Sequence, residues 1–254
     1  MTPADRNPDS TFSRTARALA WLGLVVAVVS AAAALVAGPA YRLQWMSLAT
    51  SFLALRWATY GAIASVVVGI VAWVLLTVTR APRGRAIAAM ASVLGVLVAA
   101  APLAMLYQAK RLPNIHDIST DTDDPPSFVD VLPLRQGARN PVDYEPETAA
   151  EQKRGYPDIA PLQLALPPAE AFERAERAAR AMGWEIVAAK PDALRIEATD
   201  TTLMFGFKDD IVIRIRPRPQ GSVVDVRSLS RLGGSDIGAN ARRVRAYLSK
   251  LAAD

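Results

Sequence analysis

The sequence has no cysteine and a single histidine, His116, among its 254 residues. Without thiolates there is no disulfide framework, cysteine nucleophile or cysteine metal site, and one imidazole excludes a centre built from several histidines. Charge is also scarce, at 21%, whereas 52% of the residues are hydrophobic. This balance is more apolar than that of an average soluble domain and indicates a membrane protein.

The charge is unevenly distributed along the chain. Residues 1–111 contain ten Lys and Arg against two Asp, a net of +8, whereas residues 112–254 contain 19 against 22 Asp and Glu, a net of −3. The basic residues of the first part flank apolar runs, and the second part is mildly acidic. Because nucleic-acid binding needs cations clustered on a compact domain, we expect no nucleic-acid partner.

Three uncharged apolar runs, 18–38, 57–78 and 86–107, dominate the first 111 residues. Each has about 20 residues, the length that an α-helix needs to cross a hydrocarbon core of about 30 Å. We therefore predict a transmembrane anchor of three helices in a lipid bilayer. A cleavable signal peptide is the alternative for the first run, but its apolar stretch is too long, so we expect an uncleaved helix.

The basic residues that flank these runs predict an orientation. Six of them fall on the side of the N-terminus and four on the opposite side, and the excess marks the inner side of the membrane. We therefore expect the C-terminal part on the outer side. The six are Arg6, Arg14, Arg17, Arg80, Arg83 and Arg85, and the four are Arg42, Arg56, Lys110 and Arg111.

Small residues recur at four-residue spacing within the apolar runs, as Gly61, Ser65 and Gly69 in the second and around Gly95 in the third. Such patterns let helices approach closely in lipid. Packing within a three-helix bundle is the favoured interpretation, and an oligomerisation seam is the alternative.

Residues 112–168 contain ten of the eighteen prolines, which predicts an extended linker that packs on the following domain. The acidic stretch Asn114–Asp124 lacks the spacing of a calcium loop, so we expect turn bonding and no metal there. His116 and Asp117 are candidates for acid–base chemistry, but no nucleophile motif accompanies them. An enzyme is therefore the less favoured interpretation.

Residues 169–254 have the pattern of an α+β domain, with an antiparallel sheet packed on two helices. Apolar residues recur at helical spacing over 172–182 and 236–251, and alternate over four segments between them. Lys208-Asp209-Asp210 is predicted to be a turn. The four strand segments are 184–189, 194–199, 211–216 and 223–229.

Isoleucines alternate with arginines in residues 211–216, and valines alternate with Asp and Arg in residues 223–229. A register that buries the aliphatic side chains puts all the charges on one face. Cross-strand ion pairs on a solvated face are one interpretation. The sharper one is a ligand-binding face whose guanidinium groups hold carboxylate or phosphate. The residues involved are Arg214, Arg216, Asp225, Arg227 and, beside them, Arg231.

Several spaced segments of residues 112–254 resemble the bacterial domain-of-unknown-function family fourteen-ninety-nine. They are Ile-His-Asp-Ile-Ser-Thr-Asp at 115–121, Pro-Pro-Ser-Phe at 125–128, Tyr-Pro-Asp-Ile at 156–159, and the segments 205–216 and 224–238. The resemblance implies a protein of the bacterial envelope. Together with the orientation predicted from the basic residues, this leads us to expect helices in the inner membrane, a cytoplasmic N-terminus and a periplasmic C-terminal domain. The resemblance supplies no activity, substrate or site residues.

The sequence thus favours a membrane-anchored binding or interaction module that needs no cofactor. Its partner is expected to be an anionic envelope ligand or another membrane protein. An envelope hydrolase that uses His116 and Asp117, and a scaffold subunit of a membrane complex, are the alternatives.

Overall fold

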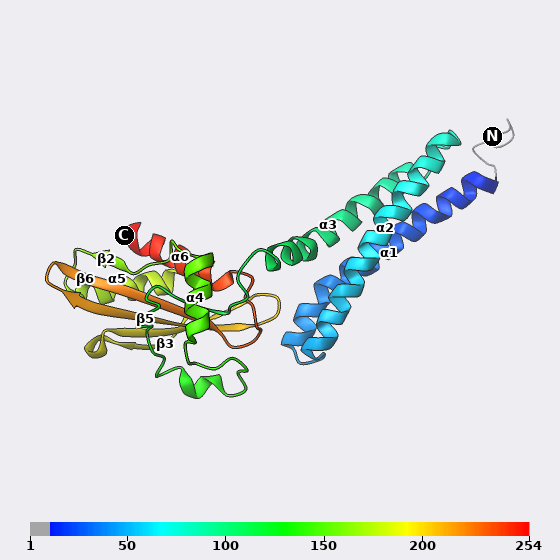
Figure 1. Cartoon of the computed structure of the whole chain (residues 1–254). Coiled ribbons are helices and arrows are strands. Elements are labelled where there is room, and N and C mark those ends of the chain that lie inside the picture. Colours follow the sequence, from blue (N-terminus) through cyan, green and yellow to red (C-terminus); the bar gives the residue numbers. More distant parts are fainter. Residues whose placement is uncertain (1–10, 254) are drawn as a thin grey trace. The chain divides into compact units, whose positions relative to one another are not determined.

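The computed structural model describes residues 11–253, so Arg6, used in the orientation argument, lies outside the described residues. The chain divides into two compact units, one that ends at Tyr107 and one that begins at Gln108. Figure 1 shows long helices in the first unit, and a sheet with shorter helices in the second.

The first unit consists of α1 (Thr11–Arg42), α2 (Leu48–Val78) and α3 (Arg85–Ala109). Each is long and apolar enough to cross a membrane, which confirms the predicted set of three helices. The helices extend beyond their apolar runs because a polar residue near a helix end does not interrupt the backbone hydrogen bonds. At the start of α2, the hydroxyl of Ser47 accepts a hydrogen bond from the Thr50 amide at 3.1 Å and caps the helix.

The small residues of the apolar runs lie where helices of the same chain approach closely. A methyl group on Gly69 of α2 would lie 2.7 Å from the carbonyl oxygen of Ala88 in α3. One on Gly95 of α3 would collide with the Ser65 hydroxyl of α2, and one on Gly61 with a serine hydroxyl of α1. These glycines therefore permit the close contacts inside the bundle.

The second unit contains a fully antiparallel, six-stranded sheet with the order β1-β6-β5-β4-β3, in which β2 also pairs with β6. The strands are β1 (Asp117–Ser119), β2 (Leu162–Leu164), β3 (Glu185–Lys190), β4 (Arg195–Thr201), β5 (Lys208–Arg218) and β6 (Gly221–Ser230). The helical segments are η2 (Leu132–Arg135), α4 (Pro146–Gly155), α5 (Pro168–Ala181), η3 (Pro191–Ala193) and α6 (Ala239–Ala253).

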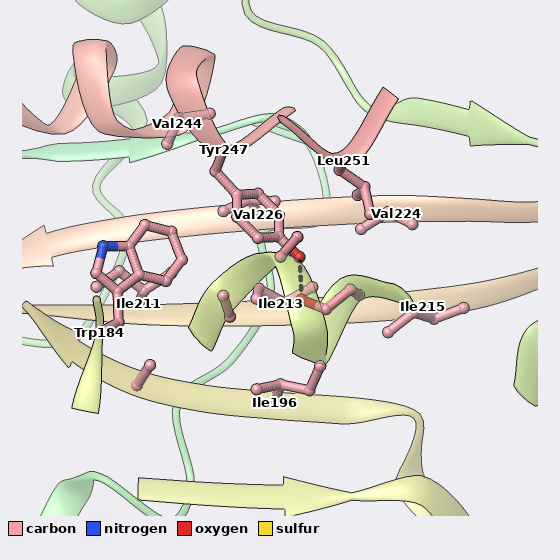
Figure 2. Packing of buried hydrophobic residues seen from close by; sticks show 14 of the residues in the cluster. Trp184, Ile196, Ile211, Ile213, Ile215, Val224, Val226, Val244, Tyr247 and Leu251 are labelled. Atoms are coloured by element: carbon pink, nitrogen blue, oxygen red, sulfur yellow. Dashed lines mark hydrogen bonds between the residues drawn. The ribbon is translucent and has the colours of Figure 1, made fainter. Parts of the chain in front are cut away.

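The main core lies between one face of this sheet and the helices α5 and α6. Ile213 of β5 opposes Val226 of β6 in the register that the sequence predicts, with the aliphatic side chains turned to the helices. Tyr247 of α6 stacks on Trp184 at 5.1 Å between ring centroids, and its hydroxyl donates to the Ala175 carbonyl at 2.9 Å (Figure 2). The predicted α+β class is confirmed.

The predicted turn at Lys208–Asp210 is wrong, because these residues form the beginning of β5. The connection lies earlier, over residues 202–207. Asp209 and Asp210 are tolerated in the strand because each carboxylate is paired, with Arg243 at 2.6 Å and with Arg231 at 2.7 Å respectively. Local polarity indicated a turn, but partners far along the chain decide the structure.

The proline-rich segment 112–168 contributes β1, β2 and α4 to the domain. The two strands have three residues each, too short to show a period-two pattern, and they form by pairing with the edge of β6. Helix α4 starts with Pro146 in its first turn, where the missing amide hydrogen breaks no hydrogen bond of the helix.

Candidate functional site

The charged side chains singled out by the sequence lie on the sheet face opposite α5 and α6. In the β5–β6 register, Arg214 is directly opposite Asp225. We call this side of the sheet the charged face, defined by Arg214, Arg216, Asp225 and Arg227. Alternation along each strand separates it from the aliphatic core.

Part of the charged face is covered by the segment of the domain between β1 and α4. Phe128 and Val131 from this segment pack against Val212 of β5 and Leu229 of β6 in a second, smaller apolar cluster. Residues between β1 and α4 therefore close over part of the sheet, and they leave the arginines with different degrees of exposure.

Arg227 is the most enclosed of these arginines. Its side chain is 4% exposed and that of Asp117 is 6% exposed, and Nη2 of the arginine lies 2.7 Å from Oδ2 of the aspartate. The guanidinium also donates to the carbonyls of Pro126 at 3.2 Å and Val142 at 2.6 Å. The rings of Phe128 and Tyr144 lie over it, with centroids 5.1 and 5.2 Å from Cζ. All three guanidinium nitrogens therefore have a hydrogen-bond partner within the domain.

The carboxyl of Asp117 is subject to two opposing effects, its burial and its contact with Arg227. Burial raises the pKa of Asp117 above its usual range, although the hydrogen bonds and charge of Arg227 act in the opposite direction. Asp117 accepts hydrogen bonds from both Nε and Nη2 of Arg227. His116 has a separate contact, because its Nδ1 lies 3.2 Å from the carbonyl oxygen of Gly234.

Arg231 belongs to a second buried cluster, around Asp210. The Asp210 carboxylate is fully buried and is contacted by Arg231 at 2.7 Å and by Arg135 of η2 at 2.5 Å. The Thr199 hydroxyl also donates a hydrogen bond to it, at 2.9 Å. Arg231 also donates to the carbonyl of Leu134, so this cluster joins the covering segment to the sheet.

Arg214 and Arg216 are the more accessible pair, with side chains 23% and 31% exposed. Both contact the fully buried Asp225, with Nη2 of Arg214 and Nε of Arg216 lying 3.1 and 2.7 Å from Oδ2. Asp121 accepts from Nη2 of Arg216 at 2.8 Å, and Asp124 lies 3.0 Å from Nη1 of Arg214. The two cations therefore meet three carboxylates within the domain.

The acidic stretch before the sheet supplies two of these carboxylates. Asp121 also accepts hydrogen bonds from the amides of Asp123 and Asp124, at 3.2 and 2.9 Å, which is the turn bonding that the sequence predicts. Burial acts to raise the pKa of Asp121, but these amides and Arg216 outweigh it and hold the pKa below its usual value.

A recess of about 500 Å³ opens where the charged face meets the residue 120–123 turn and β2. Arg216 and Arg218 contribute guanidinium groups to its lining, and Arg218 is exposed. The remaining lining residues are Thr120, Asp121, Thr122, Asp123, Ala160, Pro161, Gln163 and Val223. The recess lining therefore combines two cations and two carboxylates with hydroxyl and amide groups.

The sequence identified Arg216 as a binding residue. It missed the other residues that line this recess, among them Arg218 of β5 and Gln163 of β2. Arg218 shares the alternation of Arg214 and Arg216, so its face was predictable once the strand was known to continue through Pro217. Gln163 lies on β2, whose pairing with Val223 of β6 has no local signal in the sequence.

These features define a class of protein. It has three candidate membrane spans and an α+β domain, and the segment between β1 and α4 covers part of the charged face of that domain. The family described as "Protein of unknown function (DUF1499)" matches residues 117–251. The match covers more than half of the chain, and the chain belongs to this family. The resemblance found in the sequence is thereby confirmed. A comparison with curated proteins gave no match.

Proposed function

We propose that the protein is a membrane-tethered binding module that takes an anionic group of an envelope ligand into the recess beside Arg216 and Arg218. The proposal places the domain on the outer face of a bacterial inner membrane. The function requires recognition only, with no cofactor and no bond made or broken.

The observation that carries the proposal is the state of Arg218. Its side chain is exposed and forms no hydrogen bond or ion pair within residues 11–253, whereas each arginine that the sequence singled out has an aspartate partner. A guanidinium presents parallel N–H donors that match the oxygens of carboxylate or phosphate. The side chain of Arg216, which also lines the recess, is 31% exposed.

The carboxylates of the recess favour a ligand with a small charge. Asp121 is neutralised by Arg216 at 2.8 Å, and Asp123 by Lys153 at 2.7 Å. A single carboxylate or phosphate that approaches Arg218 therefore meets little repulsion. Arg216 is already paired with Asp121 and Asp225, which leaves Arg218 as the cation of the recess lining without a carboxylate partner in residues 11–253. The site is therefore better suited to one acidic group with hydroxyl or amide neighbours than to a highly charged polyanion.

The test is Arg218→Gln, with Arg177→Gln on the exposed face of α5 as the matched control. Inorganic phosphate and acetate are titrated into the full-length protein in detergent, and binding is followed by the NMR signals of the arginine side chains. We expect saturable binding in the wild type and the control, and about tenfold weaker binding in Arg218→Gln, equivalent to about 1.4 kcal/mol. Equal binding by all three proteins would contradict the proposal.

The location of the domain is tested separately. Because the sequence has no cysteine, an introduced cysteine is the only thiol of the chain that a maleimide can label. Gln220 lies in the exposed turn between β5 and β6 and is replaced by cysteine. A membrane-impermeant maleimide is applied to cells whose outer membrane is permeabilised. Labelling without lysis supports the periplasmic location. Labelling only after lysis contradicts it and directs the ligand search to the cytosol.

A further inference from the structure

The connection between β4 and β5 carries apolar side chains where a connecting loop ordinarily has polar ones. The loop comprises residues 202–207, with the sequence Thr-Leu-Met-Phe-Gly-Phe. Leu203 is 86% exposed and Met204 is 44% exposed, the former more than any other large hydrophobic side chain in residues 11–253. Scattered exposed apolar residues need no explanation, but two adjacent ones beside two phenylalanines form a concentrated patch.

This loop is held in a fixed shape by its own hydrogen bonds. The amide of Thr202 donates to the Phe207 carbonyl at 2.8 Å, and the Phe207 amide donates to the Thr202 hydroxyl at 2.9 Å. Gly206, with a φ of +66°, donates back to the Thr202 carbonyl at 2.9 Å. The rings of Phe205 and Phe207 stack at 5.1 Å between centroids. Because the loop is already ordered, little conformational entropy is lost when its apolar side chains bind a partner.

The loop lies at the end of the sheet where the chain arrives from the membrane helices. Thr201 pairs with Lys208 at the base of the loop, and the Lys208 carbonyl accepts from the Arg231 amide at 3.0 Å. The residue before Arg231, Ser230, donates its amide hydrogen to the carbonyl of His116 at 3.0 Å. The end of β1 that follows the tether and the base of the loop are thus joined across β6.

The tether that precedes β1 is short. Helix α3 ends at Ala109 and β1 begins at Asp117, which leaves residues 110–116 between them. Seven residues span at most about 25 Å when fully extended. A bilayer that held α3 would therefore lie within about this distance of the start of β1.

The charges at this end also suit a membrane surface. Lys110 and Arg111 stand at the start of the tether, and the exposed Lys208 follows the loop. The nearby carboxylates of Asp209 and Asp210 are neutralised inside the domain by arginines. Exposed cations beside apolar side chains are the usual composition of a segment that enters the head-group region of an anionic bilayer.

From these observations we infer that residues 203–207 form a membrane-contact loop. Its apolar side chains enter the interfacial layer of the bilayer that the chain's own helices span, and Lys208 contacts the anionic head groups. The contact gives the domain a second attachment besides the tether and restricts its rotation. It is independent of the anion recess, because the recess is formed by other residues.

The test uses the full-length protein in vesicles of phosphatidylcholine and phosphatidylglycerol. Leu203→Cys is labelled with an environment-sensitive fluorophore, and quenching by lipids that carry a nitroxide near the head group is measured. Gln220→Cys, in the turn at the opposite end of β5, is the matched control. We expect a blue-shifted emission and loss of most of the fluorescence at position 203, with no quenching at position 220. Equal quenching at both positions would contradict the inference.

A second variant distinguishes lipid contact from protein contact. Met204→Asp, in the Leu203→Cys protein, should abolish most of the lipid quenching, because a carboxylate is costly to insert into the interface. A label at position 203 that is shielded from aqueous iodide but not quenched by the nitroxide lipids would indicate a second copy of the chain on the loop, and would overturn the inference. Phosphate binding by Arg218 is measured on the same proteins, so that failure of either proposal is seen separately.

Discussion

The two faces of the sheet are closed by different physical means. On one face, isoleucines and valines of β5 and β6 pack under α5 and α6, whose own contributions include Tyr247 and Leu251. On the other face, arginines and aspartates are joined in pairs beneath the segment between β1 and α4. Burial of apolar area needs only a matching shape, whereas burial of charge needs a defined partner for each group. The charged face therefore allows fewer alternative contacts than the apolar face. Removal of one side chain should destabilise the domain more on the charged face.

The largest expected effect comes from breaking a buried pair on the charged face. Asp117→Ala leaves the Arg227 guanidinium buried with no carboxylate, which should cost about 3–5 kcal/mol of unfolding free energy. The change is measured by urea denaturation of the detergent-solubilised protein, with near-ultraviolet circular dichroism as the signal. Asp158→Ala is the control, since it removes an exposed pair with Arg245 and should cost less than about 1 kcal/mol. Similar losses in both variants would contradict the contrast between buried and exposed pairs.

A smaller loss is expected for a conservative change on the apolar face. Ile213 is fully buried between Val226 and the helices, so Ile213→Val removes one methylene and should cost about 0.5–1.5 kcal/mol. The same denaturation experiment measures it. A loss as large as that of Asp117→Ala would show that the apolar face tolerates change no better than the charged one.

The smallest effect is a pH dependence at the accessible edge of the charged face. Because the pKa of Asp121 is lower in the folded protein, its contribution to stability is present above its unfolded pKa of about 3.9. That contribution is lost as the pH falls through the lower, folded value. The stability difference between the wild type and Asp121→Asn should therefore be constant above about pH 5 and shrink below about pH 4. A difference that grows on acidification would contradict the assigned direction.

The sequence predicts the aliphatic face well because its signal is local. The alternation of Ile211, Ile213 and Ile215 with arginines determines both the strand and the sides to which its residues point. Nothing local indicates what covers the charged side. Asp117 and Arg227 are 110 residues apart, and Asp117 belongs to a three-residue strand without a pattern of its own. The sequence therefore predicts the part of the candidate recess that Arg216 of β5 forms. It does not predict the part that Gln163 of β2 forms.

The two attachments proposed for the domain also differ in how they arise from the sequence. The tether is visible as the short stretch between the third apolar run and the domain. The sequence alone does not reveal the apolar loop, because Leu203, Phe205 and Phe207 resemble the end of a buried strand. The pairing of Thr201 with Lys208 shows that these residues lie outside the hydrogen-bonded ladder of β4 and β5. A period-two pattern cannot distinguish these two cases.

The position of β6 determines the order in which the domain can be built during synthesis. In the described sheet, β1 and β2 pair with β6, which is the last of the described strands in chain order. A strand that begins at Asp117 must therefore wait for residues beyond 221 to leave the ribosome before it finds its partner. Contacts of such long sequence separation slow folding. The membrane helices are therefore synthesised well before the sheet can be completed.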